Sequence, residues 1–154
     1  MPKIDIEAIP QSNATGYPEP FNEPVQGRWW RRLAPAGKLS HIGASHVVLK
    51  PGAWSSQRHW HEAEDEMVIM LSGEAVLIED GGETILRAGD VAAWAAAVQN
   101  GHRMENRTDI DCAFIAISAG DKDGGGEYSD IDMMFAADGY FRKDGKPYPS
   151  TRIK

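Results

Sequence analysis

The chain has 154 residues, 42 % of them hydrophobic and 25 % charged, which is enough apolar material for one ordinary globular domain. Its formal net charge of −7 would repel phosphate backbones, so nucleic acid is not an expected partner. No apolar run is long enough to span a bilayer, and the start of the chain lacks the basic-then-apolar order of a signal peptide. We therefore expect no membrane partner and a cytoplasmic location.

Proline recurs along the first part of the chain, at Pro2, Pro10, Pro18, Pro20 and Pro24. Because proline lacks a backbone donor, residues 1–27 predict an extended arm that lies along the body or reaches a partner subunit. The basic and aromatic run RWWRRL follows at residues 28–33. We expect a solvated or dimer-facing patch there. Adjacent tryptophans would not readily stay in water on a monomer, so we predict a homodimer with its contact near residues 20–34.

From about residue 40, short apolar runs alternate with turns, in HIGASHVVLK, MVIML, EAVLIED, ETILRAG, DVAAW and DCAFIAIS. This rhythm is typical of an antiparallel sandwich or barrel. Gly81-Gly82 predicts one hairpin and Asp144-Gly145 another. WAAAV is too short and too closely bounded by turns to favour a helix. We predict an all-β fold with an arm over 1–27, a β-barrel over 28–120, and a C-terminal loop and hairpin over 121–154 packed on the barrel.

The stretch RHWHEAEDE carries potential metal ligands at His59, His61 and Glu66. Strand alternation would put both imidazoles on one face, already aimed at one point. If the next apolar strand pairs with this one, Glu66 returns to the same point. Neutral imidazoles with a carboxylate suit Zn, Fe, Mn, Ni or Cu better than Ca or Mg. Asp65, one residue earlier, is a rival carboxylate.

A simpler interpretation exists for each of these residues. The two histidines can be hydrogen-bonded polar groups at a barrel mouth, and Glu66 can be a surface carboxylate. His41 and His46 precede the cluster, and a core or rim position fits them better than a ligand role. Cys112 lies in an apolar run and is expected to pack as a small hydrophobe.

A second segment, GDVAAWAAAVQNGHRMEN, adds His102 in another expected strand. Together the two segments resemble the paired motifs of the cupin superfamily, although Ala95 and Ala97 stand where cupins usually carry a proline and a glycine. The resemblance covers roughly residues 40–120 and implies a double-stranded β-helix, a jelly-roll-like barrel. It also implies a divalent transition metal (Zn, Fe, Mn or Ni), held by the following ligands: His59, His61, Glu66 and His102.

Within such a barrel, strand parity from the histidines puts Gln57 and Met104 on the ligand faces. We expect Gln57, Met70 and Met104 to contact a small-molecule ligand, with Gln57 as the polar contact. The sequence shows no nucleophile triad, phosphate-cradling loop or thiolate pair, so a metal would carry most of the chemistry. We predict a metal-dependent enzyme of isomerase, lyase or dioxygenase type acting on a small oxygenated molecule. The alternative is a non-catalytic barrel that binds a sugar or organic acid.

Overall fold

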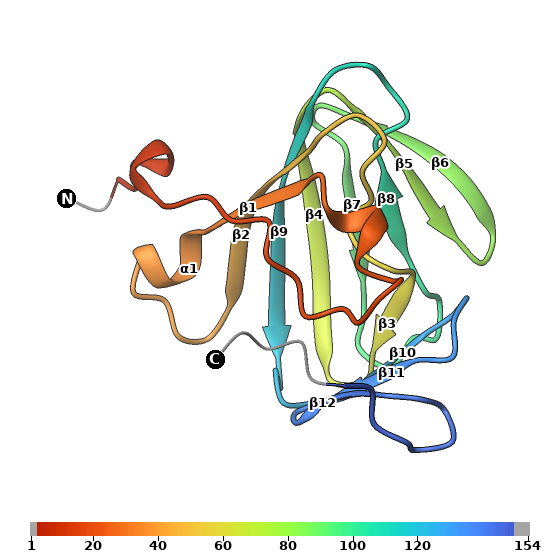
Figure 1. The fold of residues 1–154 in the computed structure, drawn as a ribbon. Helices are drawn as coiled ribbons and strands as arrows, with labels where there is room; N and C mark the ends of the chain where they lie inside the picture. The colour runs from red at the N-terminus through yellow and green to blue at the C-terminus, as the bar shows by residue number, and fades with distance from the viewer. Residues whose placement is uncertain (1–2, 150–154) are drawn as a thin grey trace.

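The computed structural model describes residues 3–149 and is built from three antiparallel sheets (Figure 1). The largest has the order β1 (Arg28–Arg32), β2 (Gly43–Leu49), β9 (Cys112–Gly120), β4 (Glu64–Ser72), β7 (Val91–Trp94). The smallest has the order β6 (Gly82–Arg87), β5 (Glu74–Glu79), β8 (Arg103–Glu105). The third has the order β12 (Gly139–Phe141), β11 (Met134–Ala136), β10 (Gly126–Tyr128), β3 (His59–His61).

Helical structure in the described part of the chain is short. It consists of η1 (Ile6–Ala8), η2 (Glu23–Val25) and α1 (Leu33–Ala36). Within residues 3–149, no helix has the length and apolar character that a bilayer crossing requires. The prediction of an all-β protein is confirmed.

Alternating side chains on the strands build the core between the five-stranded and three-stranded sheets. On β4, Val68 and Met70 point inward and are 7 % and 1 % exposed. Met67, which lies between Glu66 and Val68, is 39 % exposed. Met70 packs in one apolar cluster with Leu77 of β5 and Phe114 of β9. A sheet with one buried face requires this period of two. Burial on that face therefore fixes the register of β4 and, with it, the direction of Glu66.

Both predicted hairpins are confirmed. β5 and β6 pair antiparallel up to Glu79 and Gly82, and Gly82 takes a φ of 124° that side-chain-bearing residues rarely adopt. Near the end of the described chain, Arg142 N donates to Lys146 O at 2.7 Å, and Gly145 has a φ of 86°. The WAAAV stretch is the end of β7 followed by a turn, as expected.

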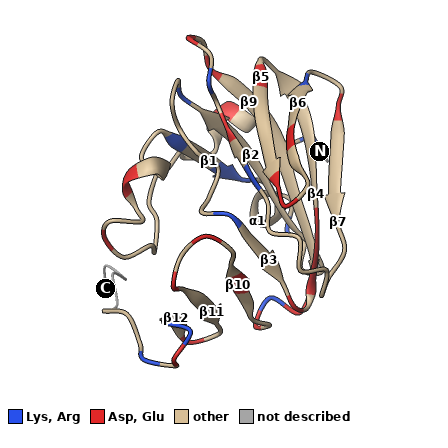
Figure 2. Ribbon diagram, turned by 90° about the vertical axis from the view of Figure 1, so that its right-hand side faces the viewer, with Lys and Arg blue, Asp and Glu red and all other residues tan. Residues whose placement is uncertain are grey.

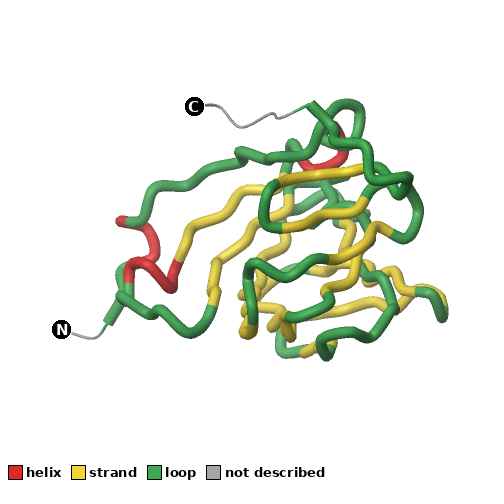
Figure 3. The backbone as a smooth tube through the Cα atoms, turned by 90° about the horizontal axis from the view of Figure 1, so that it is seen from below, coloured by secondary structure: helices red, strands yellow, loops and turns green. Residues whose placement is uncertain are grey.

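The N-terminal arm lies along its own barrel (Figures 1 and 3). Ser12 and Trp30 of β1 exchange two backbone hydrogen bonds of 3.0 and 2.8 Å. Farther along, a second apolar cluster joins the arm to the segment that carries β10: Tyr17, Val25, Tyr128 and Met133. The C-terminal strands lie below the barrel in Figure 1, next to β3. The arm and the C-terminal segment thus close the end of the barrel at which β3 lies.

The basic run of β1, coloured blue in Figure 2, is only partly exposed: Arg32 is exposed, as a solvated patch predicts, whereas Arg28 and Arg31 are partly buried. Arg31 donates to Ile9 O at 3.1 Å and pairs with Glu7 at 2.8 Å, so the arm covers it. Arg28 and Trp30 line a cavity inside the barrel. The alternation of β1, which places these two side chains on its inner face, explains the difference. The homodimer with a contact near residues 20–34 stays a prediction.

Candidate metal centre

Two histidines of β3 form the base of the candidate site. The strand pairs with β10, and alternation along it places His59 and His61 on one face with Trp60 on the other. The Nε2 atoms of the two imidazoles are 3.1 Å apart. The strand geometry therefore aims both nitrogens at one point, as the sequence predicted.

Glu66 reaches the same point from a different sheet. The pairing of its strand with the histidine strand, which would have returned Glu66 to this point, does not occur: β4 pairs with β7 and β9, whereas β3 pairs with β10. Only a short connection separates β3 from β4, and the inward side of β4 turns Glu66 toward the histidines. Its Oε1 is 3.3 Å from His61 Nε2, and its Oε2 is 4.0 Å from His59 Nε2.

His102 approaches Glu66 from the opposite side. The residue immediately precedes β8 and exchanges backbone hydrogen bonds with His59. Its Nε2 is 2.8 Å from Glu66 Oε2, and its ring is stacked on Trp94 at 3.8 Å between centroids. The ligand atoms of His59, His61 and Glu66 all lie within 4.8 Å of one another, and His102 is joined to this group through Glu66.

Outer hydrogen bonds orient the imidazoles. His59 Nδ1 lies 2.8 Å from the carbonyl oxygen of Gln57, which can only accept, so this nitrogen carries the proton. His61 Nδ1 faces the Glu64 carboxylate at 3.4 Å in the same manner. In the neutral imidazoles the bare Nε2 atoms then face the site. Metal-binding histidines commonly show this arrangement, with an outer acceptor that fixes the tautomer.

The geometry suits a shared cation. Two unprotonated nitrogens at 3.1 Å repel each other unless a proton or a metal ion lies between them. Nitrogens that bind one zinc-like ion at about 2.0–2.1 Å are themselves roughly 3.0–3.4 Å apart. The spacing of His59 and His61, together with a carboxylate oxygen beside them, thus fits a transition metal by distance and by donor type.

Electrostatics support the same conclusion. Burial lowers the pKa of His59 from 6.5 to about 4, although Glu66 opposes this, so the ring is neutral at physiological pH. Burial by itself would raise the pKa of Glu66. Hydrogen bonds to His102 and His61 outweigh burial and hold that pKa well below its usual range. For His61, burial opposes protonation, but the Glu66 carboxylate beside Nε2 stabilises the protonated ring and raises its pKa, so a metal ion at this nitrogen would displace that proton. A neutral imidazole beside a fixed carboxylate is a favourable ligand pair.

The alternative candidates lie elsewhere. Asp65 is exposed and accepts a hydrogen bond from Ala96 N at 2.8 Å, so it points away from the histidines. His41 is exposed. His46 lies on the face of β2 opposite to that of its neighbour Val47, which faces the core. Cys112 is buried in the core, and burial raises the pKa of its thiol to about 11, as expected for a small packed hydrophobe.

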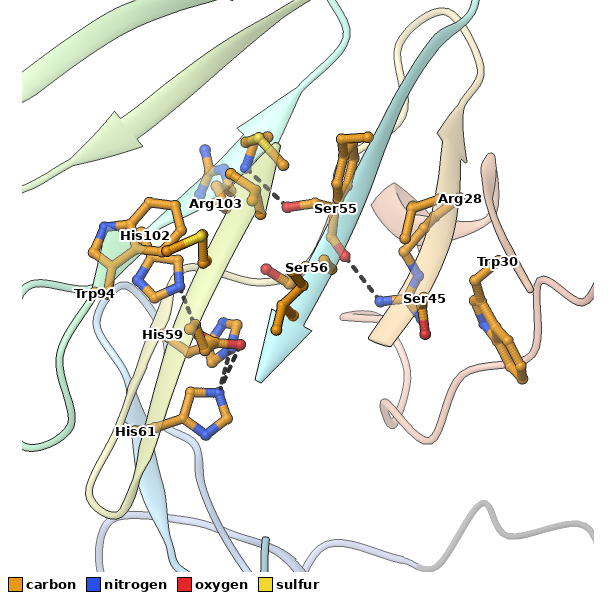
Figure 4. A pocket seen from close by; sticks show the side chains of 18 of the residues that line it. Arg28, Trp30, Ser45, Ser55, Ser56, His59, His61, Trp94, His102 and Arg103 are labelled. Atoms are coloured by element: carbon orange, nitrogen blue, oxygen red, sulfur yellow. Dashed lines mark hydrogen bonds and ion pairs between the residues drawn. The ribbon is translucent and has the colours of Figure 1, made fainter. Parts of the chain in front are cut away.

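A cavity of about 410 Å³ opens from the histidines into the barrel. In Figure 4 the three histidines lie on one side of it and Arg28 on the other. Arg28 donates to Ser55 O at 2.8 Å, while its buried Nε has no hydrogen-bond partner among the described residues. Arg103, which also lines the cavity, is paired with Glu105 at 2.7 Å. Arg28 therefore retains donors for a ligand.

Only one of the three expected substrate contacts lines the cavity. Met104 lines the cavity, whereas Met70 packs in the core cluster and is not among the lining residues. Gln57 is also absent from that lining: it is buried and donates to Phe21 O at 2.9 Å, which ties the arm to the barrel. The parity argument fails for Gln57 because the residues just before β3 form bends rather than strand. Arg28 was missed, although the alternation in RWWRR could have indicated its inner face.

These features define a double-stranded β-helix barrel with a histidine and carboxylate cluster at its mouth, and the chain is similar to known proteins. The family model for the cupin domain matches residues 45–118. A solved structure from Silicibacter pomeroyi, described as a sugar phosphate isomerase from a cupin superfamily, is 39 % identical. Its TM-score is 0.91, over 99 % of this chain and 100 % of that one.

Two further relatives are more distant. An oxalate-binding protein of Thermotoga maritima is 33 % identical over 73 residues, which are 47 % of this chain and 58 % of that protein. The solved structure of a Cupin 2 conserved barrel domain protein from Salinispora arenicola is 24 % identical with a TM-score of 0.55, over 77 % of this chain and 87 % of that one. The match to the Silicibacter pomeroyi protein spans nearly the whole of both chains, and so this chain belongs to the cupin superfamily.

Proposed function

We propose that this cupin is a divalent-metal-dependent enzyme that acts on a small oxygenated acid. The proposed metal ligands are His59, His61, Glu66 and His102. The observation that carries the proposal is the 3.1 Å separation of the His59 and His61 Nε2 atoms, with Nδ1 of each ring directed at an acceptor. A bound ion of this kind polarises a carbonyl or hydroxyl oxygen, as isomerase, lyase and dioxygenase reactions require.

The lining of the cavity favours an anionic substrate. Arg28 lies across the cavity from the cluster, and its buried Nε has no partner among residues 3–149. Guanidinium groups bind carboxylates and phosphates through paired donors. The two more similar relatives are described as a sugar phosphate isomerase and an oxalate-binding protein. Both names refer to oxygenated anions, which is the ligand class that Arg28 would select.

Other residues of the chain fix the orientation of the proposed ligands and leave few acid–base groups beside them. Trp94 fixes the His102 ring by stacking, and its Nε1 donates to Glu79 at 2.7 Å. Among the described residues that line the cavity, Glu66 is the only carboxylate, and it is hydrogen-bonded to His102 and His61. With the histidines and Glu66 assigned as metal ligands, Tyr17 is the remaining described lining residue with an ionisable hydroxyl, and burial raises its pKa to about 12. This scarcity of acid–base groups favours, as second candidate, a non-catalytic barrel that binds the same class of anion.

Metal analysis tests the metal centre. Protein purified without chelator or nickel resin is expected to carry about one transition-metal ion per chain. The double variant His59→Ala with His61→Ala should lose it. A matched control, His41→Ala with His46→Ala, removes two histidines outside the cluster and should keep it. Equal metal content in both double variants would contradict the proposed ligands.

Ligand binding and turnover separate the two candidate functions. Oxalate and glucose 6-phosphate serve as probes of the anion site. Loss of the Arg28 charge-assisted hydrogen bonds is worth about 1.5–3 kcal/mol, so Arg28→Gln should weaken probe binding by roughly 10–100-fold, and Arg28→Lys by less. Turnover restored by one specific metal supports the enzyme. Binding without turnover under any metal supports the binding module.

A further inference from the structure

A second cavity of about 440 Å³ lies on the other side of the histidine pair. His59 and His61 line both cavities, so the candidate metal centre forms a partition between them. The remaining walls of the second cavity come from the C-terminal strands and their hairpin, with Gly16 of the arm. We name this cavity the aromatic chamber. Apart from His59 and His61, its walls lie outside residues 45–118, the part of the chain matched by the family model.

The chamber has a different chemistry from the first cavity, which Arg28 lines. Five aromatic side chains line it: Tyr128, Phe135, Tyr140, Phe141 and Tyr148. Among the described lining residues, Asp138 is the only carboxylate, and no arginine or lysine is present. Ligand pockets typically have this composition, in which apolar and aromatic walls surround a few polar groups, and this size.

Strand register brings the chamber wall directly against the histidines. His61, Gly126, Phe135 and Tyr140 are successive cross-strand partners in β3, β10, β11 and β12. The Phe135 ring crosses over Gly126, where any Cβ would collide with it, and meets the His61 ring edge-on at 5.1 Å. Tyr128 lies against His59 at 5.5 Å between centroids. The glycine therefore allows an aromatic wall to contact the cluster.

We propose that the aromatic chamber is a second ligand subsite, which takes an uncharged ring of a ligand whose acidic group binds at the histidine cluster. The proposal rests on the proposed metal centre for the acidic end and on the chamber for the ring. Because His59 and His61 line both cavities, an acidic group bound at the cluster from the chamber side would place the ring of the same molecule in the aromatic chamber. An aromatic or alicyclic carboxylate belongs to this class.

Calorimetry of the zinc-loaded, full-length protein with benzoate and with acetate tests the subsite. Both probes carry the same carboxylate, so their affinity ratio isolates the ring. We expect benzoate to bind at least tenfold more tightly than acetate. Ala136→Trp should abolish the ratio by filling the chamber, because Ala136 lines it. Ala137→Trp is the matched control: Ala137 is exposed in the adjacent turn, does not line the chamber and should leave the ratio unchanged.

The outcomes are distinct. A benzoate-to-acetate ratio near one, or a ratio that survives Ala136→Trp, overturns the subsite. If Ala136→Trp folds poorly, Phe141→Ala removes one wall without added bulk and should lower the ratio several-fold. Failure of the metal centre would weaken both probes equally. In that case metal-free protein is titrated with benzyl alcohol, and NMR shifts confined to the residues that line the chamber support it, whereas unshifted signals refute it.

Discussion

Asn106 offers a sharp test of how the barrel is held together. Its side chain is 0 % exposed and makes four hydrogen bonds. The amide nitrogen donates to Leu49 O at 2.9 Å and to Ile110 O at 2.7 Å. The amide oxygen accepts from the Thr108 backbone N at 2.9 Å and from the Thr108 hydroxyl at 2.8 Å. One side chain thus connects the end of β2 with the loop between β8 and β9.

Asn106→Ala removes all four bonds and leaves buried partners unpaired. Each unsatisfied buried group costs about 1–3 kcal/mol, but Ile110 and the hydroxyl side of Thr108 are close enough to solvent to recover part of this. We therefore expect a loss of about 3–5 kcal/mol of unfolding free energy, a large share of the ~5–15 kcal/mol typical of a domain. The melting temperature should fall by roughly 10 °C.

Urea unfolding followed by circular dichroism measures this loss. Thr108→Val is the matched control, because it removes the hydroxyl and retains the backbone donor, and it should cost only about 0.5–1.5 kcal/mol. A loss below about 1 kcal/mol for Asn106→Ala, or equal losses for both variants, would refute the reasoning that this amide holds the two segments together.

Three further predictions concern packing, backbone strain and pH. Met70→Ala should lower the free energy of unfolding by about 2–5 kcal/mol, because Met70 is 1 % exposed. Met67→Ala, on the outer face of β4, should change it by no more than about 0.5 kcal/mol. Equal losses in urea unfolding would contradict the β4 register. Ala97 has a φ of 65°, so Ala97→Gly should raise the melting temperature slightly, and a lower value would exclude strain there. The pKa of His59 is about 4 in the folded protein, below the ordinary value of 6.5 that applies to the unfolded chain. As pH falls, His59 is therefore protonated in the unfolded chain before it is protonated in the folded protein. Metal-free stability should therefore decrease from pH 6.5 toward 4, by up to about 3 kcal/mol, with a smaller slope in His59→Gln.

The strands and hairpins could be predicted because they depend on local rules. Alternation of apolar residues and the turn-forming pairs Gly81-Gly82 and Asp144-Gly145 act over a few residues, and the structure confirms both hairpins. The shared face of His59 and His61 follows from strand geometry in the same way.

Other features depended on contacts that local rules do not encode. The partner of β3 is β10, about 65 residues along the chain, rather than β4. Gln57 turned away from the ligand because the arm supplies an acceptor at Phe21 O. Alternation places Arg28 and Trp30 on one face of β1, but only the pairing of β1 with β2 turned that face toward the cavity.

The sequence by itself determined an all-β barrel and the residue types that could hold a transition metal, because periodicity and donor chemistry are properties of short segments. Only the tertiary structure decided which atoms meet. Glu66 rather than Asp65 faces the histidines because burial of Val68 and Met70 sets the inward side of β4. The aromatic chamber exists because strands distant in sequence pair edge to edge, and such pairing is selected by packing of the whole molecule.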